Sequence, residues 1–369
     1  MAYALDNLPL DILIGPISRA TEALTRLDER LARSPVRDGW VERSHFADAA
    51  AALWLEGELV HLEDLVLHDA HMNIRAPTHA LTRAHGVLRA RRQIFAQERD
   101  WALGRHGLRQ LVGRGGVPAT KGGRAGEGTF VPEGETGEPA ESDPLANAFA
   151  AIDAVLERAS RVLDGAAVAP TEKPAPPDRQ TLVYDPDWDE DARLDEWRAV
   201  LADTRDLPVV LRAAIGLEAW TEIDVLQHGG WLGPLLVAAL LRQEGLAAGH
   251  LASLHLGAKY IPRERRRARH RSDRLLAALD AIHEAALAGL KVHDRLILAR
   301  ERMERRLRSR RASSKLPDLV DLVLARPLVS TGIIQARLKV SKQGALNLIG
   351  ELSLREMTGR GRYRAWGIL

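Results

Sequence analysis

The sequence predicts a mainly α-helical protein, in which a helical body interrupted by flexible linkers precedes a small helical domain that ends in a β-hairpin. Three observations predict this class. The 369 residues are 46% hydrophobic, which is enough for a large core, but only 4% are aromatic. Ala, Leu and Arg, which favour helices over strands, are abundant. Apolar residues recur at helical spacing through most of the chain.

Composition also excludes several classes of chemistry. The chain has no cysteine, which rules out disulfides, thiolate nucleophiles and cysteine-based metal sites. Asp6 stands near the N-terminus where a signal peptide would carry Lys or Arg, and no apolar run is long enough to span a membrane. We therefore expect a soluble cytoplasmic protein without cofactors.

Positive charge is concentrated at the C-terminal end. From Arg263 to Leu369 there are 25 Lys and Arg against 11 Asp and Glu, whereas the whole chain has a formal charge of only +2. This asymmetry favours a nucleic-acid partner for the C-terminal end, although solvated arginine-rich helices produce the same pattern.

The N-terminal helical block spans residues 1–112, with helical periodicity over 10–31, 45–67 and 81–103. Residues 113–143 are rich in Gly, Pro and Glu and predict a flexible linker. The run from Gly113 to Gly116 is not followed by Gly-Lys-Ser/Thr, so it does not indicate a phosphate-binding loop. A short helix over 144–163 and a second linker over 164–186 follow.

A second helical block is expected over residues 187–311. The predicted helices run over residues 189–203, 208–227, 233–244, 248–259, 262–281 and 283–311. Winged-helix proteins often bind DNA as dimers, and the long helix over 283–311 is a candidate for the dimer contact.

Residues 315–369 have the pattern of three short helices. The first ends near Arg326 because Pro327 cannot continue it. Ser330 is placed to cap the second helix, whose Ala336 is small enough for a neighbouring helix to approach. After the turn at Leu338–Val340, Ser341 caps a third helix that reaches about Arg355.

A hairpin follows these helices. Residues 357–366 read as a strand, a Gly-containing turn and a second strand, with Arg360, Arg362 and Arg364 at alternate positions. Three helices followed by such a hairpin are typical of a winged helix-turn-helix domain that binds double-stranded DNA. Some winged helices bind only proteins, and this alternative stays open.

The third helix supplies the predicted reading surface. Ala345, Leu348, Ile349 and Leu352 are expected to face inward, and Lys342, Gln343, Leu346 and Asn347 outward. Gln and Asn suit adenine edges in the major groove, and Lys342 suits phosphate or guanine. We assign DNA contacts to Lys339, Ser341, Lys342, Gln343, Asn347, Arg360, Arg362 and Arg364.

Two further arginine clusters flank this domain. Auxiliary phosphate contacts are assigned to the cluster of Arg305, Arg306, Arg308, Arg310 and Arg311. The earlier cluster over residues 263–271 is compatible with DNA contact and equally with a solvated helix face.

Parts of the body resemble the Fic family. Residues 49–57 with Leu62–Leu65 are similar to its Ser-x-x-x-Glu-Gly inhibitory helix and the continuation of that helix, with Ala52 in place of the serine. Residues 233–246 resemble the helix that follows the family's HPFxxGNGRxGR loop. The resemblance implies a Fic-like helical fold, and active members usually transfer AMP to protein hydroxyls.

The catalytic residues of that family are not present at the matching positions. With Gly233 on the last glycine of the loop, Ile223, Val225, Gly229, Trp231 and Pro234 replace its His, Phe, Asn and two Arg residues. The resemblance therefore implies a body without catalytic residues, in which Glu56 also lacks its arginine partner. An enzyme with an altered loop around Asp224 and His228 is the alternative.

The chain is also similar to a helix-turn-helix family of rhizobia that is often encoded on plasmids.

Four histidines lie close together in the sequence: His61, His68, His71 and His79. His68 and His71 are at i, i+3, but the four lack a recognised metal-binding spacing, so we assign no metal. The predicted function is a DNA-binding transcriptional regulator and not an enzyme. The alternatives are a nucleotidyl- or AMP-transferase with an altered active-site loop, or a plasmid-maintenance or toxin–antitoxin component that acts by protein contact.

Overall fold

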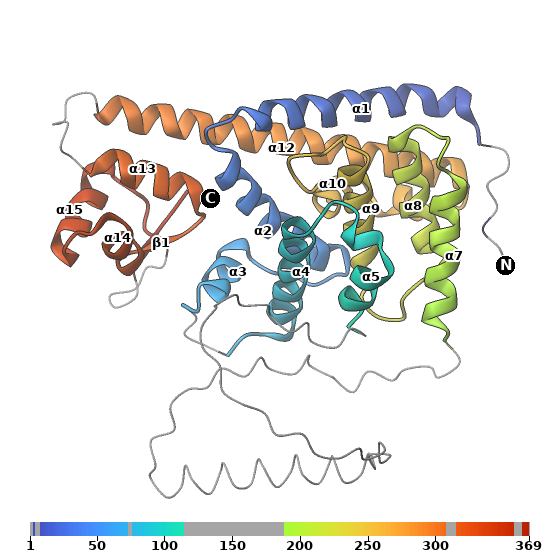
Figure 1. Cartoon of the computed structure of the whole chain (residues 1–369), viewed down its shortest axis with the longest axis horizontal. Coiled ribbons are helices and arrows are strands. Elements are labelled where there is room, and N and C mark those ends of the chain that lie inside the picture. Colours follow the sequence, from blue (N-terminus) through green and yellow to red (C-terminus); the bar gives the residue numbers. More distant parts are fainter. Residues whose placement is uncertain are drawn as a thin grey trace, which may run out of the picture. The chain divides into compact units, whose positions relative to one another are not determined.

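The computed structural model describes residues 3, 8–72, 76–113, 188–307, 315–357 and 364–368. These residues are mainly helical, and their one sheet has two short strands (Figure 1). The predicted mainly α fold is confirmed. The helix expected over 144–163 and both linkers lie outside the described residues, apart from Gly113. No described helix is long and apolar enough to cross a membrane.

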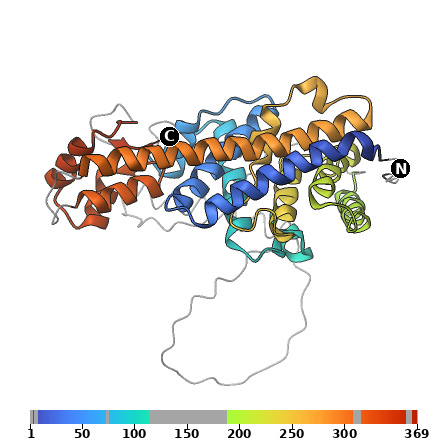
Figure 2. The ribbon, with the colours of Figure 1, turned by 90° about the horizontal axis from the view of Figure 1, so that it is seen from above.

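Two long helices lie side by side in the body. Helix α1 (Leu10–Ala32) runs along α12 (Arg271–Leu307), as Figures 1 and 2 both show. Gly289 of α12 permits the close approach, because a Cβ there would lie 2.7 Å from a methyl carbon of Leu27. The indole Nε1 of Trp40 donates a hydrogen bond to the Gly289 carbonyl over 2.8 Å.

Helix α12 differs from the prediction of two helices that meet near residue 282. The chain there reads Ala281-Ile282-His283 and contains neither Pro nor Gly, so the helix continues for 37 residues. The first part of the predicted helix over residues 262–281 forms the separate short helix α11 (Arg263–Arg266), and its later part belongs to α12. Met303 is buried near the end of α12, whereas Leu298 is 41% exposed.

The N-terminal block is divided more finely than its periodicity indicates. The segment 45–67 forms two helices, α2 (Arg37–Leu55) and α3 (Leu62–Asp69). Gly57 separates them, and its φ of 91° is a conformation that favours glycine. The remaining elements are α4 (His79–Ala96), the short 3₁₀ helix η1 (Trp101–Leu103) and α5 (Arg105–Leu111).

The second block contains α7 (Glu190–Asp203), α8 (Val209–Ile223), α9 (Leu232–Gln243) and α10 (Leu254–Lys259). Helix α8 ends earlier than predicted because Asp224 takes a left-handed conformation. Gly233 lets α9 pack against α8, since a Cβ there would lie 2.3 Å from the Trp220 ring. Trp220 in turn meets the buried Trp197 edge to face.

A buried ion pair joins three helices of the body. Asp48 of α2 accepts a hydrogen bond from Arg91 of α4, and both side chains are fully buried. Asp48 also accepts from the Leu256 backbone at 2.9 Å, and its Oδ2 lies 2.8 Å from His255 Nδ1 on α10. Because the carboxylate is satisfied from three directions, the network specifies how α2, α4 and α10 pack.

The C-terminal domain contains α13 (Leu316–Ala325), α14 (Thr331–Leu338) and α15 (Lys342–Leu352). Its strands β1 (Val329–Ser330) and β2 (Ala365–Trp366) pair antiparallel, with Val329 opposite Trp366. The predicted end of α13 before Pro327 is confirmed.

One arginine of the body holds this domain in place. Arg43 of α2 is 7% exposed, and its guanidinium donates to the carbonyls of Leu324, Val323 and Arg326 over 2.7, 3.1 and 2.9 Å. These carbonyls end α13, where a helix lacks its own donors. Arg43 Nε also donates to the Ile368 carbonyl over 2.9 Å.

Candidate nucleic-acid interface

Side-chain caps define both helices of the helix-turn-helix. Ser330 Oγ accepts a hydrogen bond from the Ile333 backbone over 3.3 Å at the start of α14. Ser341 Oγ accepts from the Gly344 backbone over 3.1 Å at the start of α15. Between the helices, Lys339 takes a left-handed conformation with a φ of 53°. Both predicted caps and the predicted turn are therefore confirmed.

Helix α15 has one buried and one exposed face. Ala345, Ile349 and Leu352 are buried, and Leu348 is half-buried. Lys342, Gln343 and Asn347 are exposed, and Gln343 Nε2 donates to Asn347 Oδ1 over 3.0 Å. The amide pair therefore presents a joined set of donors and acceptors to solvent.

Two predicted positions differ in the structure. Leu346, expected to face outward, is half-buried and packs against the core. Ala336, expected at a close helix approach, is exposed. In both cases the short helices leave few turns from which the orientation of a face can be read, so tertiary packing decides it. Lys339 and Ser341 are exposed beside the start of α15.

The described base of the wing pairs antiparallel as predicted, but its second strand also has a partner that was not predicted. The second strand pairs mainly with β1, which precedes α14, and Glu356 meets Trp366 only through an isolated bridge. Among the described residues, two backbone hydrogen bonds flank this bridge, from Met357 to the Ala365 carbonyl over 2.8 Å and from Gly367 to the Arg355 carbonyl over 3.3 Å. The sequence signal for β1 was the short apolar run after Pro327, which is too brief for the alternation that marks a strand.

The wing arginines are described in part. Arg364 donates to Glu356 Oε2 over 2.6 and 2.9 Å, and its guanidinium lies 5.3 Å from the centre of the Trp366 ring. The hydrogen bonds with Glu356 raise the pKa of Arg364, so this exposed side chain stays cationic. Arg360 and Arg362 lie outside the described residues.

The auxiliary arginines at the end of α12 have contacts within the chain. Arg306 Nη1 donates to the Leu352 carbonyl over 2.6 Å and so caps the last turn of α15. Arg305 forms an ion pair with Glu301 at 3.7 Å. Arg308, Arg310 and Arg311 lie outside the described residues.

The residues that the resemblance matched to the loop of the Fic family lie near the end of α8 and the start of α9. Ile223 and Val225 are buried, and Gly229 has a φ of 91°. Trp231 and Pro234 line a cavity of about 310 Å³ that also receives Ala52, Leu55 and Glu56 of α2. Glu56 forms an ion pair with Arg83 of α4, a partner that the resemblance to the Fic family did not predict.

The histidines do not gather around a metal position. Among the described residues, no group of three or more His, Asp or Glu side chains is arranged to hold a metal ion. Helix α3 ends at Asp69, so His71 is not on its face with His68 as the i, i+3 spacing predicted. His85 Nε2 instead lies 3.1 Å from Asp69 Oδ1, and the His68 and His85 rings meet edge to face.

Comparisons with known proteins divide the chain at the same place as its secondary structure. Residues 182–308 match the family described as "Protein of unknown function (DUF1612)", and residues 316–369 match the family described as "HTH DNA binding domain". The chain is 50% identical over 381 residues, covering 100% of both chains, to "Uncharacterized protein y4cF" of Sinorhizobium fredii (strain NBRC 101917 / NGR234). The predicted likeness to rhizobial helix-turn-helix proteins and the DNA-binding class of the C-terminal domain are confirmed.

Proposed function

Because the chain belongs to the family in which a DUF1612 body precedes a helix-turn-helix DNA-binding domain, we propose that it is a transcriptional regulator that binds double-stranded DNA. The observation that carries this proposal is the exposed face of α15, where Lys342 and the Gln343–Asn347 pair lie beside the capped start of the helix. In helix-turn-helix domains the N-terminal residues of the second helix contact base edges.

The proposed contacts divide by chemistry. Gln343 and Asn347 read adenine edges in the major groove, and Lys342 contacts phosphate or guanine. Lys339, Ser341 and Arg364 contact the backbone, and Arg360 and Arg362 extend this contact along the wing. Arg305, Arg308, Arg310 and Arg311 supply further positive charge, whereas Arg306 stabilises the end of α15.

The body is proposed to be a Fic-like scaffold without catalytic activity. The approach of Ala52 and Glu56 to Trp231 and Pro234 around one cavity supports this proposal, because the resemblance expects an inhibitory helix beside the catalytic loop. The apolar and aromatic side chains at the loop positions cannot transfer protons or hold phosphates. We place the protein in the cytoplasm, associated with the nucleoid.

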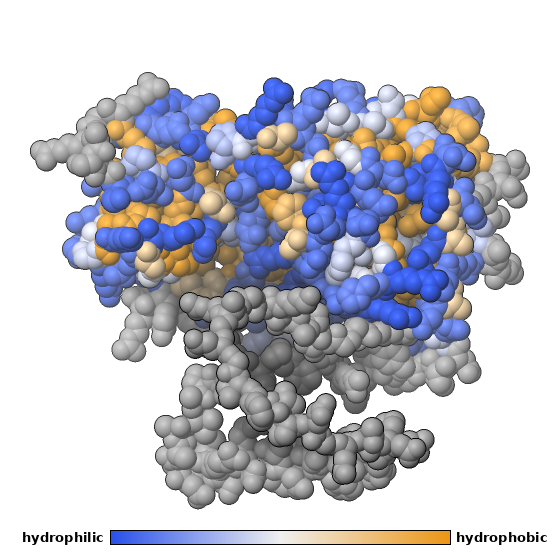
Figure 3. Space-filling model, in the orientation of Figure 1, coloured by the Kyte–Doolittle hydropathy of each residue, from blue (hydrophilic) through white to orange (hydrophobic). Residues whose placement is uncertain are grey.

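The regulator is proposed to act as a homodimer on paired half-sites. Exposed apolar side chains on the two long helices support this assembly. Leu298 of α12 is 41% exposed, and Leu10, Ile12 and Ile14 at the start of α1 are 51%, 44% and 70% exposed. Apolar residues gather at this end of α1 in Figure 3, at the upper right.

The test is binding of the full chain to genomic and random-sequence DNA, followed by salt titration. Gln343→Ala or Asn347→Ala is expected to weaken the preferred sequence about 5- to 150-fold while leaving random DNA unaffected, since each lost base contact costs about 1–3 kcal/mol. Arg364→Ala is expected to weaken all sequences and to reduce the salt dependence by about one counterion.

Lys291→Ala is the matched control for Lys342→Ala, because Lys291 is an exposed lysine of α12 in the body. We expect Lys291→Ala to bind like the parent and Lys342→Ala to bind more weakly. If the parent binds no DNA at low salt, or if all α15 variants bind like the parent, the proposed function is wrong.

A further inference from the structure

The cavity beside α2 has the size and lining of a small-molecule site. Its volume of about 310 Å³ is at the lower end of the range for such sites. Its walls come from α2, α8, α9, α10, α11 and α12 and from the loop before α9. Most of the lining is apolar, and the indole rings of Trp220 and Trp231 provide its aromatic part.

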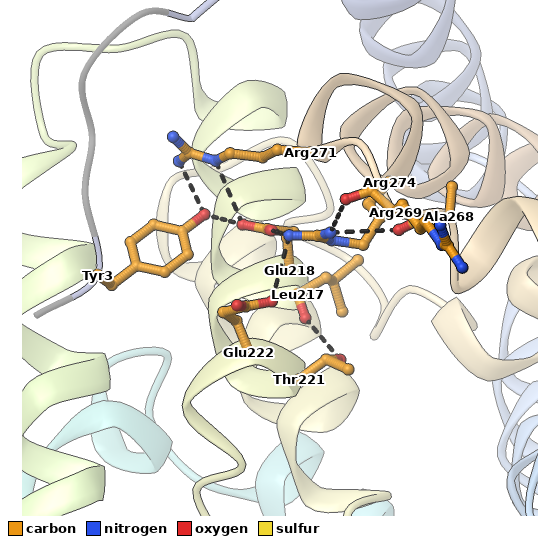
Figure 4. Close-up of polar contacts among 9 residues, drawn as sticks. All are labelled: Tyr3, Leu217, Glu218, Thr221, Glu222, Ala268, Arg269, Arg271 and Arg274. Atoms are coloured by element: carbon orange, nitrogen blue, oxygen red, sulfur yellow. Dashed lines mark hydrogen bonds and ion pairs between the residues drawn. The ribbon is translucent and has the colours of Figure 1, made fainter. Parts of the chain in front are cut away.

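The two acidic side chains of the lining already have cationic partners. Glu218 is almost completely buried, accepts from the Tyr3 hydroxyl and lies 2.6 Å from Arg274 Nη2 and 3.5 Å from Arg271 Nε (Figure 4). Burial and the hydrogen bond with Glu218 raise the pKa of Tyr3, so the phenol stays neutral. Glu56 pairs with Arg83. A cationic ligand would therefore find no acidic group without a partner here.

Two arginines of the lining, Arg266 at the end of α11 and Arg267 directly after it, differ from these acidic residues in their contacts. Arg266 Nε donates to the Ile261 carbonyl over 3.0 Å, and neither Arg266 nor Arg267 forms an ion pair with another described residue, although Glu264 acts on Arg266 at longer range. Burial, together with Arg267 and Arg263, lowers the pKa of Arg266, and Glu264 opposes this shift only in part. The cavity is therefore apolar over most of its lining and carries positive charge at Arg266 and Arg267 that no ion pair with a described residue neutralises.

We propose that this cavity binds a small carboxylic acid with an apolar body, whose carboxylate is held by Arg266 and Arg267. A guanidinium presents paired donors that match a carboxylate, and a bound anion offsets the repulsion among the neighbouring arginines. The apolar body lies against Trp220 and Trp231, where its burial from water favours binding. Glu218 and Arg274 hold the cavity wall and do not contact the anion.

The test uses the full chain without DNA and measures naphthoate binding by isothermal titration calorimetry. Naphthalene carboxamide is the uncharged probe of the same shape. We expect naphthoate to bind at least tenfold more tightly than the amide. The double variant Arg266→Gln, Arg267→Gln is expected to lose at least tenfold in naphthoate affinity while binding the amide like the parent.

The matched control is Arg265→Gln, because Arg265 belongs to the same short helix but pairs with Asp280 at 2.7 Å and does not line the cavity. We expect it to bind naphthoate like the parent. Ala278→Leu, which adds bulk to the cavity wall, is expected to weaken both probes. A thermal melt of each variant shows whether it folds.

The proposal would be overturned by no naphthoate binding, by equal affinity for naphthoate and the amide, or by equal loss in the Arg265→Gln control. Tighter binding of adenosine monophosphate than of naphthoate would also overturn it, in favour of a phosphate ligand. Because no DNA is present, the result is independent of the proposed DNA-binding function.

Discussion

Asp48→Asn is expected to lower the free energy of unfolding by about 3–5 kcal/mol. The substitution leaves the buried guanidinium of Arg91 without its counter-ion, and water cannot replace it because both side chains are fully buried. His255 also loses a charged partner at 2.8 Å. Urea unfolding followed by circular dichroism at pH 7 measures the change.

Asp38→Asn is the control for this prediction, because Asp38 lies on the same helix with its side chain 89% exposed. Its effect is expected to stay within about 0.5 kcal/mol. The double variant Asp48→Asn, Arg91→Met should be more stable than Asp48→Asn alone, since it also removes the unpaired charge. Equal stability of Asp48→Asn and the parent would contradict the network.

The contribution of Asp48 is also expected to depend on pH. Burial alone would raise the pKa of this carboxyl, but Arg91, His255 and the Leu256 backbone outweigh burial and hold it below the ordinary value of 3.8. The stabilisation is therefore fully present above the ordinary pKa and is lost as the pH falls through the lowered value. The difference in unfolding free energy between the parent and Asp48→Asn should shrink below pH 4.

Arg43→Met is expected to destabilise the C-terminal domain by about 3 kcal/mol or more. Methionine keeps much of the apolar stem but leaves the last carbonyls of α13 without donors, and each unsatisfied buried carbonyl costs about 1–3 kcal/mol. Burial lowers the pKa of Arg43 to about 10, so the guanidinium is still charged at pH 7 and its hydrogen bonds are charge-assisted. Scanning calorimetry should show the domain melting before the body.

Arg33→Met is the matched control, because Arg33 is an exposed arginine just after α1. Its melting curve should coincide with that of the parent. Arg43→Lys should fall between the two, since an ammonium group retains the charge but cannot span carbonyls from residues 323 to 326 and 368 at once. A single unshifted transition in Arg43→Met would disprove the role of this contact.

The parts of the fold that were predictable depend on local chemistry. Ser330 and Ser341 cap helices through the backbone three residues later, and Pro327 ends α13 by its own geometry. A sequence shows such short-range relations directly. The exposed positions of Lys342, Gln343 and Asn347 followed from the same helical spacing.

The unpredicted parts depend on residues far apart in the chain. Arg43 meets Leu324 across 281 positions, and Asp48 meets His255 across 207. The β1–β2 pairing likewise joins Val329 to Trp366. Composition and periodicity do not specify such partners, so a buried arginine in α2 looks in sequence like any surface arginine. The charge asymmetry was detectable, but not the fact that Arg306 contacts α15 instead of solvent.

The contact around α2 has a consequence for recombination between related genes. Gly39 lies so close to α13 that a Cβ there would be 1.8 Å from the Leu324 carbonyl oxygen, and Arg43 lies one helical turn further along. In a chimera whose residues after 314 come from another helix-turn-helix protein, α2 therefore still has a surface that fits the original α13. Chimeras whose donor also supplies the helix with Gly39 and Arg43 should fold with both parts packed together. Exchange of the C-terminal segment alone should leave that domain poorly packed against the body. The C-terminal domain must therefore be exchanged together with α2, although Arg43 of that helix precedes Leu324 by 281 residues.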